Sequence, residues 1–242
     1  MATLFAIITV SFFMMKFAPG GPFDQEKSPP ENIRKAIMAK YHLDKPLYKQ
    51  YFIYLGGLAQ LDLGPSFKVA HLTVNEVISE GIGPTLKLGA LAMFIAVSFG
   101  LIIGLIAALN HNSWMDHLVM STAMLGISIP NMVLAPILLL FLGIKMRLLP
   151  VSGLETASSY ILPAFCLSLF FIANIARLTR GSMLEVLSSN YIRTARSKGL
   201  PTWHIVIFHC LKPTLIPVVS YLGPATAGML AGSLVIEKIF VI

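Results

Sequence analysis

The chain has 242 residues, of which 56% are hydrophobic and only 12% are charged. Because soluble globular domains carry about 25% charged residues, this composition excludes an ordinary soluble protein and indicates a multi-spanning membrane protein. The net charge of +7 does not indicate nucleic-acid binding, because the excess of cations lies mainly in one segment, residues 177–212.

The first apolar segment, residues 3–17, is shorter than a typical membrane span of about 20 residues. A cleavable signal peptide is an alternative, because apolar runs of this length occur in such leaders. Residues 18–22, APGGP, stand where a small-residue cleavage pattern would be expected. We therefore favour a membrane segment.

The next segment, residues 18–85, is polar and charge-balanced, which predicts a region folded outside the membrane. A helix is predicted to begin near Pro46. Its apolar face is expected to pack against the spans rather than to bind peptide. This face consists of Leu47, Tyr51, Tyr54 or Leu55, and Leu58. The sequence from Thr73 to Glu76 has the pattern of a capping box and predicts another helix start.

Four longer apolar segments are predicted to cross the membrane: residues 86–109, 118–142, 160–176 and 215–234. Two Gly-x-x-x-Gly pairs predict close helix packing, because glycine lets neighbouring helices approach. These pairs are Gly100 with Gly104 and Gly228 with Gly232.

Proline interrupts the predicted span 118–142 at Pro130, and the freed backbone groups must be satisfied by neighbouring helices or water. Pro130 and Asn131, together with Asn174 in the following span, are therefore candidates for a translocation pathway. A plain kink packed against a neighbouring helix is the alternative.

The most cationic segment, residues 179–212, connects the last two spans, and its excess of Lys and Arg predicts a cytoplasmic location. A short helix over about Asn190–Ser197 is predicted within it, because Gly199 and Pro201 are typical helix-ending residues. One interpretation is a solvated loop that only fixes topology. The spacing of Ala195 and Gly199 favours a docking element, because small residues let a partner surface approach the backbone.

This loop resembles the EAA loop of ABC-transporter membrane subunits, the segment that docks on their ATPase subunits. The resemblance is carried by residues 179–187, TRGSMLEVL, and by residues 191–201, YIRTARSKGLP. Residues 13–23, FMMKFAPGGPF, add a match near the first apolar segment. Together these motifs are similar to the peptide-importer branch, in particular to oligopeptide permeases. Arg193 and Thr194 stand where the general motif has Glu and Ala.

The resemblance implies an all-α, polytopic membrane helix bundle of the ABC-importer permease type, with about five spans present, the first shortened and the sixth missing. It implies a partial first span in residues 1–17, an extracytoplasmic helical insertion in residues 18–85, and a transmembrane permease domain in residues 86–242. The cytoplasmic coupling loop would be residues 179–212. The implied ATPase-coupling residues are Tyr191, Arg193, Thr194, Ala195, Arg196, Lys198, Gly199, Leu200 and Pro201.

The function implied by the resemblance is that of a permease subunit in the bacterial inner membrane. It would translocate oligopeptides with ATP hydrolysed by separate subunits, so the chain itself would be no enzyme and would bind no cofactor. The implied partners are a second homologous permease subunit, two cytoplasmic ATPase subunits that hold ATP and Mg²⁺, an extracytoplasmic peptide-binding protein, and membrane lipid. No nucleic acid is expected among them.

The chemistry that the sequence lacks agrees with this interpretation. It contains no G-x-x-x-x-G-K-[ST] nucleotide-binding motif, and its scattered histidines predict no metal site and no catalytic residue. An importer of dipeptides, nickel or another small solute is the alternative within the same class. A secondary carrier or channel is disfavoured, because ion-coupled carriers usually keep ionisable residues at membrane depth. A membrane-embedded enzyme is disfavoured by the missing nucleophile–base or metal constellation.

Overall fold

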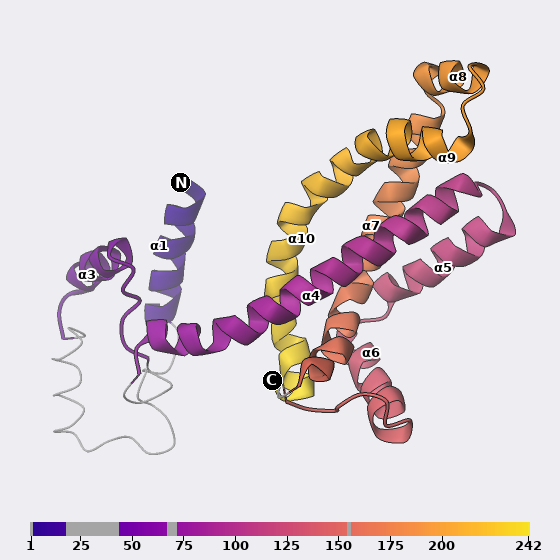
Figure 1. Cartoon of the computed structure of the whole chain (residues 1–242). Helices are drawn as coiled ribbons and strands as arrows, with labels where there is room; N and C mark the ends of the chain where they lie inside the picture. Colours follow the sequence, from indigo (N-terminus) through magenta and orange to yellow (C-terminus); the bar gives the residue numbers. More distant parts are fainter. Residues whose placement is uncertain (1, 18–43, 67–71, 154–155) are drawn as a thin grey trace. The chain divides into compact units, whose positions relative to one another are not determined.

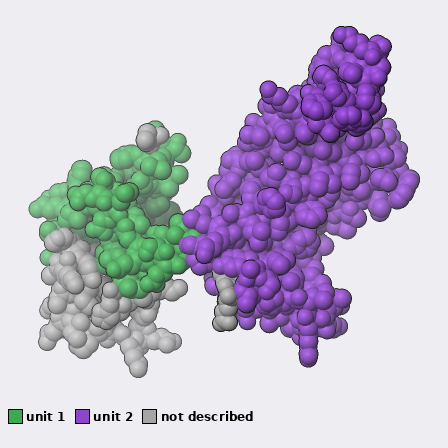
Figure 2. Space-filling view, in the orientation of Figure 1, with its two compact units in different colours: residues 1–82 green, residues 83–242 purple. Residues whose placement is uncertain are grey.

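The computed structural model describes residues 2–17, 44–66, 72–153 and 156–242, and these residues are mainly helical (Figure 1). The predicted all-α fold is confirmed. Contacts divide the chain into two compact units, residues 1–82 and residues 83–242 (Figure 2). Parts of the predicted insertion, residues 18–43 and 67–71, lie outside the described residues, as does the end of the motif that begins at Phe13.

The first unit contains helices α1 (Ala2–Phe17) and α3 (Leu47–Ala59). Phe12 of α1 is buried, and its ring centroid lies 5.2 Å from that of Tyr51 and 5.4 Å from that of Tyr54 on α3. The hydroxyls of Thr9 and Tyr51 are 2.7 Å apart. Two tyrosines of the face that was predicted to pack against the spans therefore pack against the apolar helix α1.

Helix α4 (Val74–Leu109) begins at the predicted capping box. The Thr73 backbone amide donates to Glu76 Oε2 at 2.7 Å, and the Glu76 amide donates to Thr73 Oγ1 at 3.3 Å. These reciprocal bonds satisfy two amides at the helix start. The prediction from the Thr73–Glu76 pattern is confirmed.

The second unit continues along α4 and contains the remaining described helices (Figure 1). Besides α4, two helices are long and apolar enough to cross a membrane. These are α7 and α10, each taken together with the short helical turns that precede it. The elements after α4 are α5 (Trp114–Ser128), α6 (Asn131–Leu138), η1 (Leu139–Lys145), η2 (Ala157–Tyr160), α7 (Ile161–Leu187), α8 (Asn190–Ser197), α9 (Thr202–His204), η3 (Ile205–Cys210) and α10 (Leu211–Phe240).

The segment predicted as one span over residues 118–142 is instead a broken pair. Helix α5 ends at Ser128, and the next helical segment, Asn131–Lys145, leaves at an angle of 106°. Pro130 caps the start of α6 in an extended conformation, with φ −59° and ψ 139°. The sequence located the break but not its size, because neighbouring helices determine how far the two halves diverge. The described residues thus hold three helices long enough to span, or four if the bent pair is one span, besides the shorter α1.

The predicted packing role of the glycines is confirmed for one pair. Gly100 and Gly104 of α4 are buried where side chains and carbonyls of α7 approach closely, so a side chain at either position would collide with α7. Around Gly228 and Gly232 of α10, by contrast, no other part of the described chain lies within 4 Å of an added Cβ atom. Close packing at this second pair therefore has no partner within the described chain and stays a prediction.

The two ends of the second unit bring together segments that are distant in the sequence. At one end, the Thr85 hydroxyl donates to Glu237 Oε1 at 2.8 Å, and the Gly153 amide donates to the Phe240 carbonyl at 3.2 Å. The turn between α4 and α5 and the helix α8 lie at the opposite end (Figure 1). This grouping agrees with the predicted topology, in which the turn and α8 are both cytoplasmic.

Candidate functional site

Helix α8 spans Asn190–Ser197, as predicted, and its end is fixed by a regular motif. Gly199 has φ +76°, which a residue without a side chain adopts readily. Its amide donates to the Arg196 carbonyl at 2.9 Å, and the Leu200 amide donates to the Ala195 carbonyl at 3.3 Å. This pair of bonds is a Schellman motif, which satisfies carbonyls that a helix end would otherwise leave free.

One face of α8 is buried in the protein itself. Ile192 is 0% exposed and Ala195 is 7% exposed, and both belong to an apolar cluster, the α8 cluster, with half-buried Leu200 at its edge. The other buried members come from α4, α7 and η3: Ala108, Met183, Ile205 and Cys210. The expectation that Ala195 contacts a partner needs correction, because its side chain faces the chain's own core.

The rest of the surface of α8 is exposed. Three of the exposed side chains on and just after α8 are cations, and the helix contains no carboxylate. The exposed residues named as coupling candidates are Tyr191, Arg193, Thr194, Arg196 and Lys198. The Tyr191 hydroxyl donates to the His209 carbonyl at 3.5 Å, which leans this ring toward η3. Pro201 is exposed and caps α9, with its carbonyl accepting bonds from the amides of His204 and Ile205. The structure therefore presents a small, rigid, cationic surface at one end of the unit.

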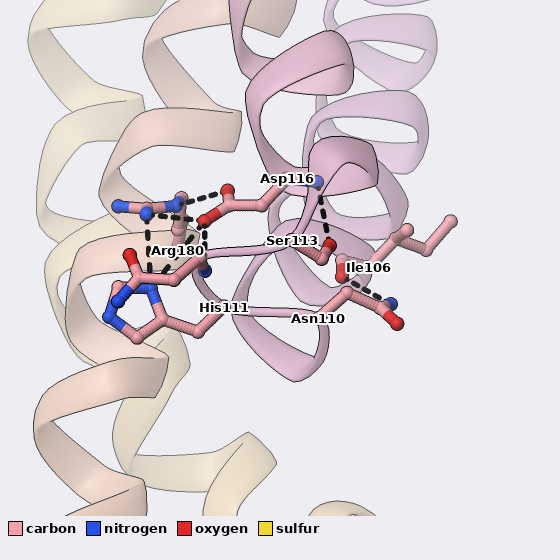
Figure 3. Close-up of polar contacts among 7 residues, drawn as sticks. Ile106, Asn110, His111, Ser113, Asp116 and Arg180 are labelled. Carbon is pink, nitrogen blue, oxygen red and sulfur yellow. Dashed lines mark hydrogen bonds and ion pairs between the residues drawn. The ribbon is translucent and has the colours of Figure 1, made fainter.

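A second polar constellation lies where α5 begins beside α7 (Figure 3). Arg180 of α7 donates from Nε to Asp116 Oδ1 and from Nη2 to Asp116 Oδ2, each at 2.7 Å. The Asn112 amide donates to Asp116 Oδ2 at 3.0 Å, and the Ser113 hydroxyl accepts from the Asp116 amide at 3.2 Å. Two parallel bonds between a guanidinium and a carboxylate are among the strongest and most directional side-chain contacts.

The ion pair between Asp116 and Arg180 is largely shielded from water. Asp116 is 1% exposed and the Arg180 side chain is 26% exposed. His111 lies at the rim with 46% exposure, and its Nδ1 is 3.2 Å from Arg180 Nη2 and 3.5 Å from Asp116 Oδ2. A carboxylate shielded from water needs its charged partner, so the pair holds the turn before α5 against α7.

The interpretation of the sequence missed Asp116, although one signal was present. Asp116 is the only acidic residue between Glu80 and Glu155, and it follows Ser113 at the spacing of a helix cap. Its partner, Arg180, is 64 positions away and was counted only as part of the cationic loop. A lone acid at the end of a span is a signal that could have been paired with a cation on a neighbouring helix.

No hydrogen bond joins the three pathway candidates, all of which lie in the described part of the chain. Pro130 and Asn131 lie at the break between α5 and α6, where Asn131 is half-buried. Asn174 donates to the Phe170 carbonyl at 2.8 Å and accepts from Arg177 Nη2 at 2.7 Å, so its amide is engaged within α7. A pathway role for these three residues stays a prediction.

Comparison with known proteins adds the following. The model of a family described as "Binding-protein-dependent transport system inner membrane component" matches residues 100–241. The chain is similar to the oligopeptide transport system permease protein OppB of Haemophilus influenzae, with 48% identity over 240 residues, 98% of this chain and 78% of that protein. It is 50% identical over the same shares to OppB of Escherichia coli K12. The dipeptide transport system permease protein DppB of Bacillus subtilis is 44% identical over 241 residues, 100% of this chain and 78% of that protein.

Proposed function

Because the chain belongs to the family of binding-protein-dependent transport system inner membrane components, we propose that it carries peptides across the inner membrane as the permease subunit of an ATP-binding cassette importer. Its location is the inner membrane, and its role is translocation rather than chemical catalysis. ATP and Mg²⁺ are held and used by two cytoplasmic ATPase subunits. A homologous permease subunit completes the membrane part, and an extracytoplasmic binding protein delivers the peptide.

Helix α8 is the single observation that supports this proposal most strongly. One face is anchored by Ile192 and Ala195 in the α8 cluster, and the other presents Arg193, Arg196 and Lys198 to the surroundings. A loop that served only as a topology signal would need the cations but not the anchored face or the fixed end at Gly199. An element that transmits movement needs all three.

The proposed mechanism is alternating access. ATP binding closes the two ATPase subunits, and their movement displaces α8 together with the spans to which it is anchored. The energy of ATP reaches the spans only if the ATPases contact α8 differently in their open and closed states. The broken pair α5 and α6 is the segment that we assign to the moving lining, because irregular backbone at membrane depth is tolerated where it faces protein or a cavity.

The proposed cargo is an oligopeptide, because the relatives with 48% and 50% identity are named as oligopeptide permeases. The similarity to a dipeptide permease, at 44% identity, makes dipeptides the second candidate. Both cargoes share a backbone with charged ends. The two candidates therefore differ in length rather than in chemistry.

Uptake in cells that lack their own peptide permeases tests the proposal. The chain is expressed with the other subunits of its transporter, and labelled peptides of two to five residues are offered. We expect uptake of tripeptides and longer peptides that disappears when the ATPase subunits are inactive. Uptake of dipeptides alone would support the second candidate. If the assembly retains its ATPases but imports none of these peptides, the cargo assignment is wrong.

A further inference from the structure

The pair Asp116–Arg180 joins the two parts of the chain that the proposed function requires to move together. Asp116 lies in the first turn of α5, the helix that leads to the break at Pro130. Arg180 lies on α7, one turn before Met183, which is fully buried in the α8 cluster. The bond between them is therefore a direct connection from the anchored side of α8 to the broken span.

The route from α8 to Arg180 is continuous. Ile192 and Ala195 of α8 pack in the same cluster as Met183 of α7. The Thr214 hydroxyl of α10 donates to Met183 Sδ at 3.4 Å, which ties α10 to the same point. Because α7 is one uninterrupted helix over Ile161–Leu187, a displacement of its cytoplasmic end at Met183 also displaces Arg180.

A second contact between α5 and α7 is of a different kind. At Gly126 an added Cβ atom would lie 3.0 Å from the Leu169 carbonyl, so the two helices touch closely there through backbone and apolar groups. Such surfaces allow helices to slide past each other by small shear movements. The fork of Arg180 on Asp116 has two directional bonds and a shielded carboxylate, so it resists sliding and is either made or broken.

We propose that Arg180 and Asp116 are positioning residues of the transport cycle, which make the broken pair of α5 and α6 follow the movement of α8. The inference rests on the proposed function, because it concerns how ATP hydrolysis is linked to peptide movement. It assigns the pair no contact with peptide or nucleotide. His111 lies at the exposed rim of the pair. It is a minor contributor, because the Asp116 carboxylate already accepts hydrogen bonds from both Nε and Nη2 of Arg180.

The test uses the complete transporter in proteoliposomes, with peptide-loaded binding protein outside and ATP on the ATPase side. Two rates are measured on the same preparation: ATP hydrolysed and peptide imported. The main variant is Arg180→Lys, which keeps the charge but loses the two-bond fork. We expect the ATP hydrolysed per peptide imported to rise by about tenfold, within the range usual for coupling between sites. An unchanged ratio in this variant would overturn the inference.

Arg177→Lys is the matched control. Arg177 lies one turn earlier on the same helix. Its side-chain hydrogen bond is with Asn174 of α7 itself, and among the described residues it forms no ion pair with a carboxylate on another helix. We expect a wild-type ratio for this variant. A rise as large as that of Arg180→Lys would mean that any arginine in this part of α7 affects the ratio, which contradicts a specific role for the pair.

A double-variant comparison separates the pair from two independent effects. Asp116→Asn, Arg180→Gln and their combination are compared at equal amounts of assembled, ATPase-retaining complex. A link that is already broken cannot be broken again, so the combination should have the same ratio as either single variant. Ratios that multiply in the combination would refute the link. A wild-type chain that imports no peptide would instead contradict the proposed function, and the two failures are therefore distinguishable.

Discussion

Gly104 of α4 lies so close to Thr179 of α7 that a Cβ atom on Gly104 would stand 2.6 Å from the Cβ atom of Thr179 and 2.5 Å from the Ala176 carbonyl oxygen. Real Cβ atoms do not approach that closely. Membrane helices associate by close packing rather than by exclusion from water, so this contact determines how near α4 can come to α7. The contact lies between the two helices that contribute Ala108 and Met183 to the α8 cluster.

Gly104→Ala is expected to push α4 away from α7 and to destabilise the protein by about 1–3 kcal/mol, the usual cost of overpacking. The measurement is the apparent melting temperature of the purified protein in detergent. Gly181→Ala on α7 is the control, because nothing else in the described chain lies within 4 Å of its added Cβ atom. Equal melting temperatures for the two variants would contradict the packing.

Ala195→Leu is expected to lower the melting temperature, because three added carbons must fit where Ala195 is 7% exposed against the α8 cluster. The cost should again be about 1–3 kcal/mol. The neighbouring change Thr194→Ala removes an exposed side chain and should leave the melting temperature unchanged. If Ala195→Leu leaves the melting temperature unchanged and Thr194→Ala lowers it, the assignment of the buried and exposed faces of α8 is wrong.

Gly199→Glu is expected to abolish peptide uptake and to release the ATPase subunits, while the protein still inserts into the membrane. The positive φ of Gly199 costs about 1–2 kcal/mol in a residue with a side chain, and the open space beside it would be filled by the glutamate. Uptake, membrane insertion and retained ATPase are measured together.

Two further variants at this end of α8 test why Gly199→Glu abolishes uptake. Gly199→Asn keeps a residue that tolerates positive φ and adds little bulk, so it should retain more uptake than Gly199→Glu. Arg196→Ala removes one exposed cation of several and should do less harm than Gly199→Glu. The reverse order, with Arg196→Ala worse, would favour the interpretation of this loop as a topology signal.

The predicted topology is tested by thiol labelling from outside the cell. A cysteine at Gln60, on the first unit, should react with a membrane-impermeant reagent, and a cysteine at Ser197, on α8, should be protected. Both positions are exposed, and the native Cys166 and Cys210 are buried and unpaired, so the background should be low. Labelling at position 197 together with protection at position 60 would reverse the assignment.

Local signals were sufficient for α8 and for the start of α4. Gly199 and Pro201 determine where α8 ends, and Thr73 and Glu76 begin α4, because each effect acts within four or five residues. The same kind of reasoning found the break at Pro130. It could not give the bend of 106°, which depends on how α6 packs against the other helices.

Long-range relationships were beyond the sequence signals. Asp116 and Arg180 are 64 positions apart, and the lone acid at the end of a span indicates that a cation is needed but not which one. Which face of α8 is buried also depends on α4, α7 and η3, so Ala195 was expected to face a partner although it faces the core. Likewise, Gly100 and Gly104 meet α7 whereas Gly228 and Gly232 meet nothing in the described chain, although both pairs have the same spacing.

Because the Schellman motif at Gly199 completes α8 within the chain, the helix is folded before any partner arrives. Association then avoids the entropy loss that a disordered segment undergoes when it folds on binding. Arg193, Arg196 and Lys198 remain exposed and act over roughly 8 Å at physiological ionic strength, so they govern the speed of encounter with an oppositely charged surface. Raising the salt concentration should therefore slow assembly of the transporter far more than it shortens the lifetime of the assembled complex.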